Sequence, residues 1–219
     1  MTTFALIHGG GSTAWDWHLV SPLLRDAGHD VVAVDLPIEN PEAQLDDYVD
    51  TVVAAVGDRQ HVIVVGHSLG GFTAPLVCDA LRADGLVYLS AMIPLPGERF
   101  GVWWTATGHD RETIDSDPDV LFFNGVPREL ADEARRRERD QAGAWMSGAW
   151  PAERLPDVAT LAILCLDDRF FPAGFMRRHV GDRLGITPVE IPGGHYAMLT
   201  HPRAVAGALD DFAKEIAAA

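Results

Sequence analysis

The chain has 219 residues, of which 47% are apolar and 22% are charged. This composition is ordinary for a globular protein and excludes a disordered or collagen-like chain. Asp and Glu number 32 against 17 Lys and Arg, so the formal net charge at pH 7 is −15. Because an acidic surface repels phosphate groups, we expect neither nucleic acid nor an anionic membrane as a partner.

The two cysteines, Cys78 and Cys165, each lie in an apolar run, where small buried thiols are expected rather than a disulfide framework. No basic region precedes the first apolar run, and no apolar stretch approaches the ~18 residues of a membrane span. We therefore expect a cytoplasmic protein, a monomer or a homodimer, that acts on a small-molecule substrate.

Strand-like and helix-like segments alternate along the chain. Short apolar runs predict strands at residues 4–8, 31–35, 61–66, 86–91, 161–166 and 189–191. Helical spacing predicts helices at residues 15–27, 44–56, 69–81, 128–141, 173–184 and 202–218. Apolar strands that alternate with amphipathic helices indicate an α/β fold, with a mostly parallel sheet of about six strands flanked by helices.

The alternation stops between residues 94 and 157, where aromatic residues, acidic turns and prolines gather. We expect a single domain over residues 1–219, with residues 94–157 inserted after the fourth strand as a small cap. An aromatic-lined pocket would favour a substrate with an apolar or aromatic part. Trp103, Trp104 and Phe123 are predicted to line it, although any of them could instead belong to the core of the cap.

The segment Gly66-His67-Ser68-Leu69-Gly70 contains the pattern G-x-S-x-G between a predicted strand and a predicted helix. This setting is typical of a tight turn that presents a nucleophilic serine above the carboxyl edge of a sheet. Ser68 would be the nucleophile, and the N–H of Leu69 would face an oxyanion at the start of the helix. The alternative is a glycine-rich helix start with a capping serine.

A serine nucleophile needs a base and an acid, which in this fold class follow it in the order acid, then histidine. His195 comes after the last predicted strand and is the expected base. Asp168, after the fifth strand, is the expected acid, with Asp167 as the alternative. Of the other histidines, His8 is expected to order the neighbouring loop, and His179 to lie on a helix surface.

A glycine loop, Gly9-Gly10-Gly11, follows the first predicted strand. The N–H of Gly10 is the expected second oxyanion donor, because glycine lets the main chain approach the substrate closely. The loop lacks the spacing and the lysine of a phosphate-binding loop. The sequence predicts neither a metal site nor a cofactor.

These motifs resemble the α/β-hydrolase family, and within it the branch of plant methylesterases and hydroxynitrile lyases with their bacterial esterase relatives. The similarity is carried, in chain order, by residues 8–17, 22–36, 66–71, 121–129 and 195–202. It spans nearly the whole chain and is loosest in the predicted cap. The resemblance implies the same fold, a Ser-His-Asp triad and no cofactor.

The sequence departs from parts of this family at positions that matter for chemistry. Hydroxynitrile lyases carry a threonine, a cysteine and a lysine where this chain has Gly9, Leu69 and Tyr196. Since that lysine would stabilise cyanide, its absence argues against cyanohydrin cleavage. Haloalkane dehalogenases and epoxide hydrolases of the fold use an aspartate nucleophile, which Ser68 is not.

The sequence therefore predicts a serine hydrolase that acts on a small carboxylic ester through an acyl-enzyme. Two alternatives stay open. The same triad could serve a C–C bond hydrolase, a thioesterase or a lyase. The fold could also serve a catalytically silent ligand-binding protein, because such proteins can retain the triad.

Overall fold

The computed structural model describes residues 1–109 and 117–218. Within these residues, six strands form a single parallel sheet in the order β2-β1-β3-β4-β5-β6. The strands are β1 (Thr3–Ile7), β2 (Asp30–Ala33), β3 (Val62–His67), β4 (Gly85–Leu89), β5 (Ala159–Cys165) and β6 (Val189–Ile191). Each predicted strand is present with ends shifted by at most two residues, which confirms the α/β fold.

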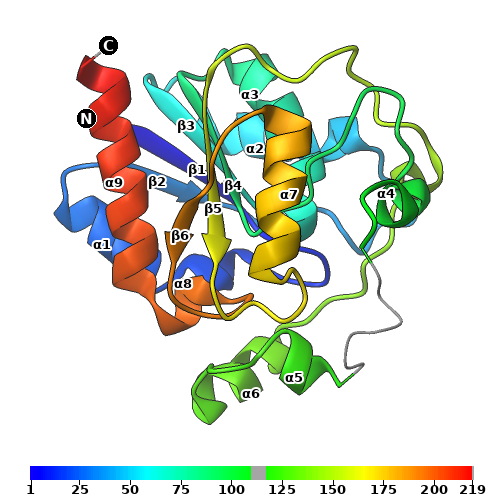
Figure 1. Cartoon of the computed structure of the whole chain (residues 1–219). Helices are drawn as coiled ribbons and strands as arrows, with labels where there is room; N and C mark the ends of the chain where they lie inside the picture. The colour runs from blue at the N-terminus through cyan, green and yellow to red at the C-terminus, as the bar shows by residue number, and fades with distance from the viewer. Residues whose placement is uncertain (110–116, 219) are drawn as a thin grey trace.

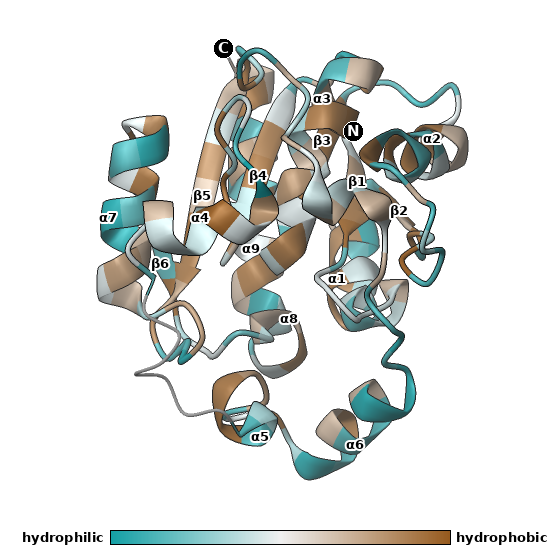
Figure 2. Ribbon diagram, turned by 90° about the vertical axis from the view of Figure 1, so that its right-hand side faces the viewer, coloured by the Kyte–Doolittle hydropathy of each residue, from teal (hydrophilic) through white to brown (hydrophobic). Residues whose placement is uncertain are grey.

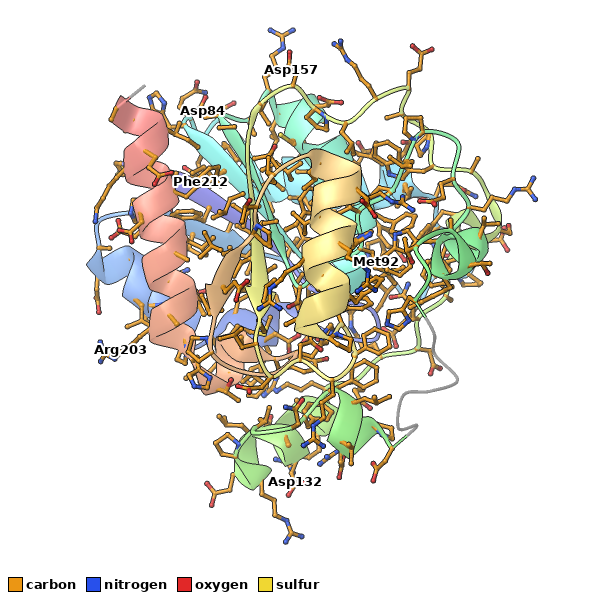
Figure 3. All side chains as sticks on the ribbon, viewed as in Figure 1. Asp84, Met92, Asp132, Asp157, Arg203 and Phe212 are labelled. Carbon is orange, nitrogen blue, oxygen red and sulfur yellow. The ribbon has the colours of Figure 1, made fainter. Side chains whose placement is uncertain are left out.

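Helices cover both faces of the sheet (Figure 1). One face packs on α1 (Val20–Asp26) and α9 (Pro202–Ala218), and the other on α2 (Leu45–Val56), α3 (Ala74–Leu81) and α7 (Ala173–Leu184). Side chains alternate along β1, so that Phe4 and Leu6 join the first core and Ala5 and Ile7 the second. Figure 3 shows Phe212 reaching from α9 toward the sheet, where it packs in the first core.

The strand order creates a switch point between β1 and β3. From β1 the chain moves outward to β2, and from β3 it moves in the opposite direction to β4, β5 and β6. In open parallel sheets, ligands bind outside the carboxyl ends of the strands at such a point. The loops that leave β1 and β3 are the glycine loop and the turn at Ser68, so the topology brings the two predicted motifs together.

Between β4 and β5 the structure has α4 (Phe100–Ala106), α5 (Pro118–Leu121), α6 (Arg128–Arg136) and the short 3-10 helix η3 (Ala144–Ser147). In Figures 1 and 2, α5 and α6 lie beyond the carboxyl ends of the strands, whereas α4 lies level with the sheet. Figure 2 also shows that α6 is mostly hydrophilic and the central strands are mostly hydrophobic. The segment predicted to form one cap therefore has two parts in different places, α4 beside the sheet and α5 with α6 beyond the ends of the strands.

Three predicted helices differ from the observed ones. Residues 15–27 form a 3-10 helix, η1 (Ala14–Trp17), followed by α1. Residues 69–81 begin as a 3-10 helix, η2 (Ser68–Phe72), and α3 starts only at Ala74, with Pro75 in its first turn, where proline's missing N–H is tolerated. The helix predicted over 128–141 ends at Arg136, and the following residues contact the glycine loop instead.

Two further predictions concern buried side chains. Cys78 and Cys165 are buried free thiols, as predicted. His179 is only 4% exposed, so its predicted place on a helix surface is wrong. Its Nε2 accepts a hydrogen bond from the Ile93 N–H, which lets the ring be buried neutral. No helix among the described residues is long and apolar enough to cross a lipid bilayer.

Candidate active site

Ser68 lies at the turn between β3 and η2, in an unusual backbone conformation. Its φ is +51°, in the left-handed region that residues other than glycine rarely adopt. The Ser68 carbonyl accepts a hydrogen bond from the Met92 N–H at 3.0 Å, which ties the turn to the end of β4. Such a strained turn exposes the side chain of its central residue and is held by the packing around it.

The two glycines of the motif are required by close packing. A methyl group on Gly66 would lie 2.7 Å from Cβ of Ala74, and one on Gly70 would lie 2.7 Å from the His8 carbonyl oxygen. Real Cβ atoms do not approach neighbours so closely. The glycines therefore let the helix pack directly against the turn and the β1 loop, which fixes the direction of the Ser68 side chain.

A chain of two hydrogen bonds links the three predicted triad residues. The Ser68 hydroxyl lies 2.9 Å from His195 Nε2, and His195 Nδ1 lies 2.9 Å from Asp168 Oδ2. All three residues are buried. A carboxylate can only accept, so Nδ1–H donates to Asp168, and Nε2 is left to accept the serine proton. This is the arrangement in which a histidine acts as general base toward a serine.

The structure also separates the two candidate acids. The second oxygen of Asp168 accepts hydrogen bonds from the N–H groups of Phe170 and Phe171, both at 2.9 Å, which fixes the carboxylate behind His195. Asp167 is exposed, and its Oδ2 accepts from the Gly193 N–H at 3.2 Å. Asp167 thus joins the loops after β5 and β6, and Asp168 is the residue that contacts His195.

His67 connects the serine turn to the base. Its Nε2–H donates to the His195 carbonyl at 3.0 Å, and the two ring centroids are 4.8 Å apart. Burial, with a smaller contribution from nearby His195, holds the pKa of His67 well below its usual value. A neutral His67 therefore positions the His195 backbone without placing a second charge beside the imidazole.

The glycine loop lies against the serine turn. A Cβ on Gly9 would lie 3.1 Å from Ser68 Cβ, and one on Gly10 would lie 3.0 Å from Leu69 Cδ2. The two predicted oxyanion donors, Gly10 and Leu69, are therefore adjacent beside the nucleophile. Within residues 1–109 and 117–218, no acceptor takes a hydrogen bond from the Gly10 N–H, which leaves this donor free for a ligand.

A buried acid that sequence reasoning missed lies beside this loop. Asp16 is 2% exposed and accepts a hydrogen bond from the Ser12 hydroxyl. Burial raises the pKa of Asp16 to about 7, against the opposing effect of the Ser12 hydrogen bond. Asp16 sits between two tryptophans in the sequence, which gave no sign of an acidic role.

A cavity of about 170 Å³ opens at the triad. It is lined by Gly9, Gly10, Gly11, His67, Ser68, Phe122, Phe123, Glu138, Arg139, His195 and Tyr196. Phe123 is among these residues, and it stacks on Tyr196 with ring centroids 5.0 Å apart. Phe122 and Tyr196 were missed, although each is the direct neighbour of a residue that the sequence singled out.

The structure does not place Trp103 or Trp104 in the described lining of this cavity. Trp103 is fully buried, its Nε1–H donates to the Ile93 carbonyl at 3.1 Å, and its ring packs against Phe171. Trp104 packs on Phe170 with a centroid distance of 5.9 Å. Both belong to α4, which lies level with the sheet and not over its carboxyl edge (Figures 1 and 2), so the structure does not support the prediction that they line the cavity.

The described residues contain no group of three or more His, Cys, Asp or Glu side chains that could hold a metal ion. The polar groups of the site instead form hydrogen bonds that hold the serine, its base and the glycine loop in place. What this arrangement can do chemically is deliver an activated hydroxyl to a carbon whose oxygen faces backbone N–H groups.

The family model described as "Alpha/beta hydrolase family" matches residues 4–208. The chain belongs to this family. Among curated relatives, norfluorocurarine synthase 2 of Strychnos sp is 38% identical, over 97% of this chain and 96% of that protein. Salicylic acid-binding protein 2 of Nicotiana tabacum is 26% identical, over 96% of each chain.

Solved structures agree with this assignment. The crystal structure of polyneuridine aldehyde esterase superposes with a TM-score of 0.81 at 25% identity, covering 96% of this chain and 98% of that one. Esterases among the relatives place this alpha/beta hydrolase in the plant methylesterase branch and support a hydrolase function. The relatives also include proteins named as synthases, so the family alone does not select the reaction.

Proposed function

We propose that the protein is a serine carboxylic ester hydrolase that uses Ser68, His195 and Asp168. The observation that carries the proposal is the pair of 2.9 Å contacts that join Ser68 Oγ to His195 and His195 to Asp168, with Ser68 and His195 lining a cavity. The exposed alternative acid, Asp167, and the free N–H of Gly10 fit the same assignment.

The first half-reaction forms an acyl-enzyme. Ser68 Oγ bonds to the ester carbonyl carbon while His195 Nε2 takes the hydroxyl proton, and the carbonyl electrons move to the oxygen. The N–H groups of Gly10 and Leu69 stabilise this oxyanion. Collapse breaks the bond to the alkoxide, which leaves with the proton from His195. Asp168 keeps the imidazole oriented and stabilises its cationic form.

The second half-reaction repeats these steps with water. His195 takes a proton from a water molecule, whose oxygen bonds to the acyl carbon, and then returns a proton to Ser68 as the acid product leaves. No cofactor is needed for either half. Catalysis in both halves relies on the same two N–H donors, so their placement beside Ser68 is decisive.

The cavity favours a small ester. Drug-sized ligands occupy pockets of roughly 300 Å³ or more, whereas this cavity measures about 170 Å³. Phe122, Phe123 and Tyr196 supply an apolar, aromatic wall for one part of the substrate. We therefore expect short acyl chains to be turned over faster than long ones.

Turnover of p-nitrophenyl esters from acetate to octanoate, by wild type and Ser68→Ala side by side, tests this proposal. The expected result is activity that falls with chain length in the wild type and drops by about 10⁴-fold or more in the variant. Equal turnover in both proteins would contradict the mechanism.

The synthase-named relatives support one second candidate, a related reaction such as thioester or C–C bond hydrolysis with the same triad. Acyl thioesters and β-diketones in the same substrate panel separate it from ester hydrolysis. Ligand affinity without turnover of any compound would instead favour a silent binding protein.

A further inference from the structure

The glycine loop is held by a segment far away in the sequence. After α6, the chain leaves the helix and climbs toward the side of the molecule that holds β1, β2 and α2 (Figure 2). There the Arg139 N–H donates to the Gly11 carbonyl at 2.9 Å, and the Gly11 N–H donates to Gln141 Oε1 at 3.3 Å. Both main-chain groups of Gly11 are thus taken up by residues that lie about 130 positions later.

The guanidinium of Arg139 makes a second set of contacts, with the residues that flank the glycine loop on either side and with Leu36. Nε and Nη2 both donate to the Ser12 carbonyl, at 3.2 and 2.9 Å. Nη1 donates to the Leu36 carbonyl at 3.0 Å, and Nη2 also donates to His8 Nε2 at 3.2 Å. These bonds use four of the five N–H groups of an arginine. Although Arg139 lines the cavity, these four N–H groups donate to protein acceptors and not to a substrate anion.

His8 holds the other end of the glycine loop. Its Nε2 accepts from the Leu36 N–H at 3.0 Å as well as from Arg139, so this nitrogen carries no proton. The proton is on Nδ1, which donates to the Gly9 carbonyl at 2.8 Å. Burial, assisted by the charge of Arg139, lowers the pKa of His8 to about 4. Every residue of the loop except Gly10 is therefore fixed through its backbone.

A loop of three glycines needs such support. Glycine has the widest range of backbone conformations, and Gly11 has a φ of +68°. Oxyanion stabilisation requires donors that are already in place when charge develops. Gly10, with its free N–H, lies between the two clamped residues Gly9 and Gly11, so its direction depends on them.

We propose that Arg139 is a positioning residue that holds the glycine loop in the conformation in which the Gly10 N–H stabilises the oxyanion. The inference rests on the proposed ester hydrolysis and deepens it. It makes the segment between β4 and β5 part of the catalytic machinery, through the loop and without contact with the reacting atoms. Because the Gly10 N–H that Arg139 positions stabilises the transition state, loss of Arg139 lowers kcat and leaves substrate affinity nearly unchanged.

The main test compares Arg139→Ala with Arg136→Ala, using p-nitrophenyl acetate. Arg136 is an exposed arginine on α6 that pairs with Glu133 and does not line the cavity, which makes it a matched control. The expected result is a loss of kcat of roughly 10- to 100-fold in Arg139→Ala with KM changed less than about threefold. Arg136→Ala keeps wild-type kcat.

Two further readouts separate positioning from a purely structural role. A trifluoromethyl ketone, to whose carbonyl carbon Ser68 Oγ adds, creates the oxyanion in the site, whereas the matching secondary alcohol does not. Arg139→Ala is expected to weaken binding of the ketone by the same factor by which it lowers kcat. Binding of the alcohol is expected to stay unchanged. Guanidinium chloride at non-denaturing concentration is expected to restore part of the activity of Arg139→Ala and none of that of Ser68→Ala.

Arg139→Lys and Gln141→Ala keep the test decisive if Arg139→Ala fails to fold. A lysine cannot bridge several carbonyls as a guanidinium does, so Arg139→Lys is expected to lose part of kcat. Gln141→Ala removes one bond to Gly11 and is expected to lose less. Wild-type kcat in both variants, a fall in thermal stability alone, or a rise in KM alone would overturn the proposal.

Labelling of Ser68 by a fluorophosphonate distinguishes this inference from the proposed function. If the wild type is not labelled at Ser68, the proposed function fails and the inference with it. If the wild type and Arg139→Ala are labelled at the same rate, the serine chemistry stands and only the role of Arg139 is wrong.

Discussion

The two walls of the cavity are built differently. On the sheet side, Ser68, His195 and Asp168 are buried at the ends of three strands and fixed by backbone hydrogen bonds and close-packed glycines. On the α5–α6 side, Phe123 stacks on Tyr196, and polar groups on the surface add further contacts. The Asn124 amide donates to the Asp167 carbonyl at 2.9 Å, and the Arg135 guanidinium lies 4.8 Å from the centre of the Phe123 ring.

The sheet side therefore carries the catalytic groups, whereas the α5–α6 side shapes the cavity. The triad depends on core packing, which tolerates little change. The ion pairs of α6, such as Arg136 with Glu133, are exposed, and exposed pairs contribute little to stability. Figure 3 shows Asp132, another α6 residue, on the outer side of the molecule. The residues of the α5–α6 wall can therefore be replaced to suit different substrates, provided that the contacts of Arg139 around the glycine loop are kept.

The largest expected effect lies on the sheet side and separates the neighbouring acids. Asp168→Asn is expected to lower kcat by about 10⁴-fold, because an amide favours the wrong histidine tautomer. Asp167→Asn keeps an oxygen that can accept from Gly193 and is expected to stay near wild type. Steady-state kinetics on p-nitrophenyl acetate measures both. Similar losses in the two variants would contradict the assignment of the acid.

The next comparison sets a core aromatic against a cavity aromatic. Trp103→Ala is expected to lower the free energy of unfolding by about 3–5 kcal/mol, because a fully buried indole is lost. Phe122→Ala is expected to raise KM with a smaller loss of stability, because Phe122 lines the cavity. Urea unfolding and KM measured on the same two variants test this. The reverse pattern would restore Trp103 as a lining residue.

Glycine substitutions compare the packing of the two regions. Gly66→Ala is expected to destabilise the protein by about 1–3 kcal/mol, because the new methyl collides with Ala74. Gly101→Ala, on α4, meets no described atom within 4 Å and is expected to stabilise the helix by about 0.5–1 kcal/mol. Thermal unfolding of both variants gives the signs. Equal effects would mean that the serine turn is not closely packed.

A further expected effect is a pH dependence of the protein's stability that arises from Asp16. Its pKa is about 7 in the folded protein and 3.8 in the unfolded chain, so folding binds a proton between these pH values. The free energy of unfolding therefore falls as pH rises through this window, by at most about 1.4 kcal/mol per pH unit. Asp16→Asn removes this term, so its stability relative to wild type should increase from pH 5 to pH 8 in urea unfolding. A constant difference would show that Asp16 does not titrate in this range.

The sheet side could be predicted from the sequence because local signals agree there. Continuous apolar runs mark the strands, and Gly66 and Gly70 mark the turn at Ser68. Chain order and strand ends then select His195 and Asp168. Each of these features is encoded within a few neighbouring residues, so no knowledge of distant contacts was needed.

The α5–α6 side could not be predicted in the same way. The periodicity of residues 128–141 is helical throughout, yet the helix ends at Arg136 because Arg139 and Gln141 bond a loop near the N-terminus. An aromatic-rich segment likewise does not reveal which rings face a cavity and which fill a core, as Trp103 shows. Both outcomes depend on contacts between residues that are far apart in the sequence.

Intact-protein mass spectrometry can detect whether Ser68 forms an acyl-enzyme. The wild type is mixed with p-nitrophenyl acetate and quenched in acid during the first turnovers. We expect a mass increase of one acetyl group, located on the peptide that contains Ser68 and absent in Ser68→Ala. An unmodified wild type that releases p-nitrophenol with a burst, or an acetyl group that persists in Ser68→Ala, would contradict it.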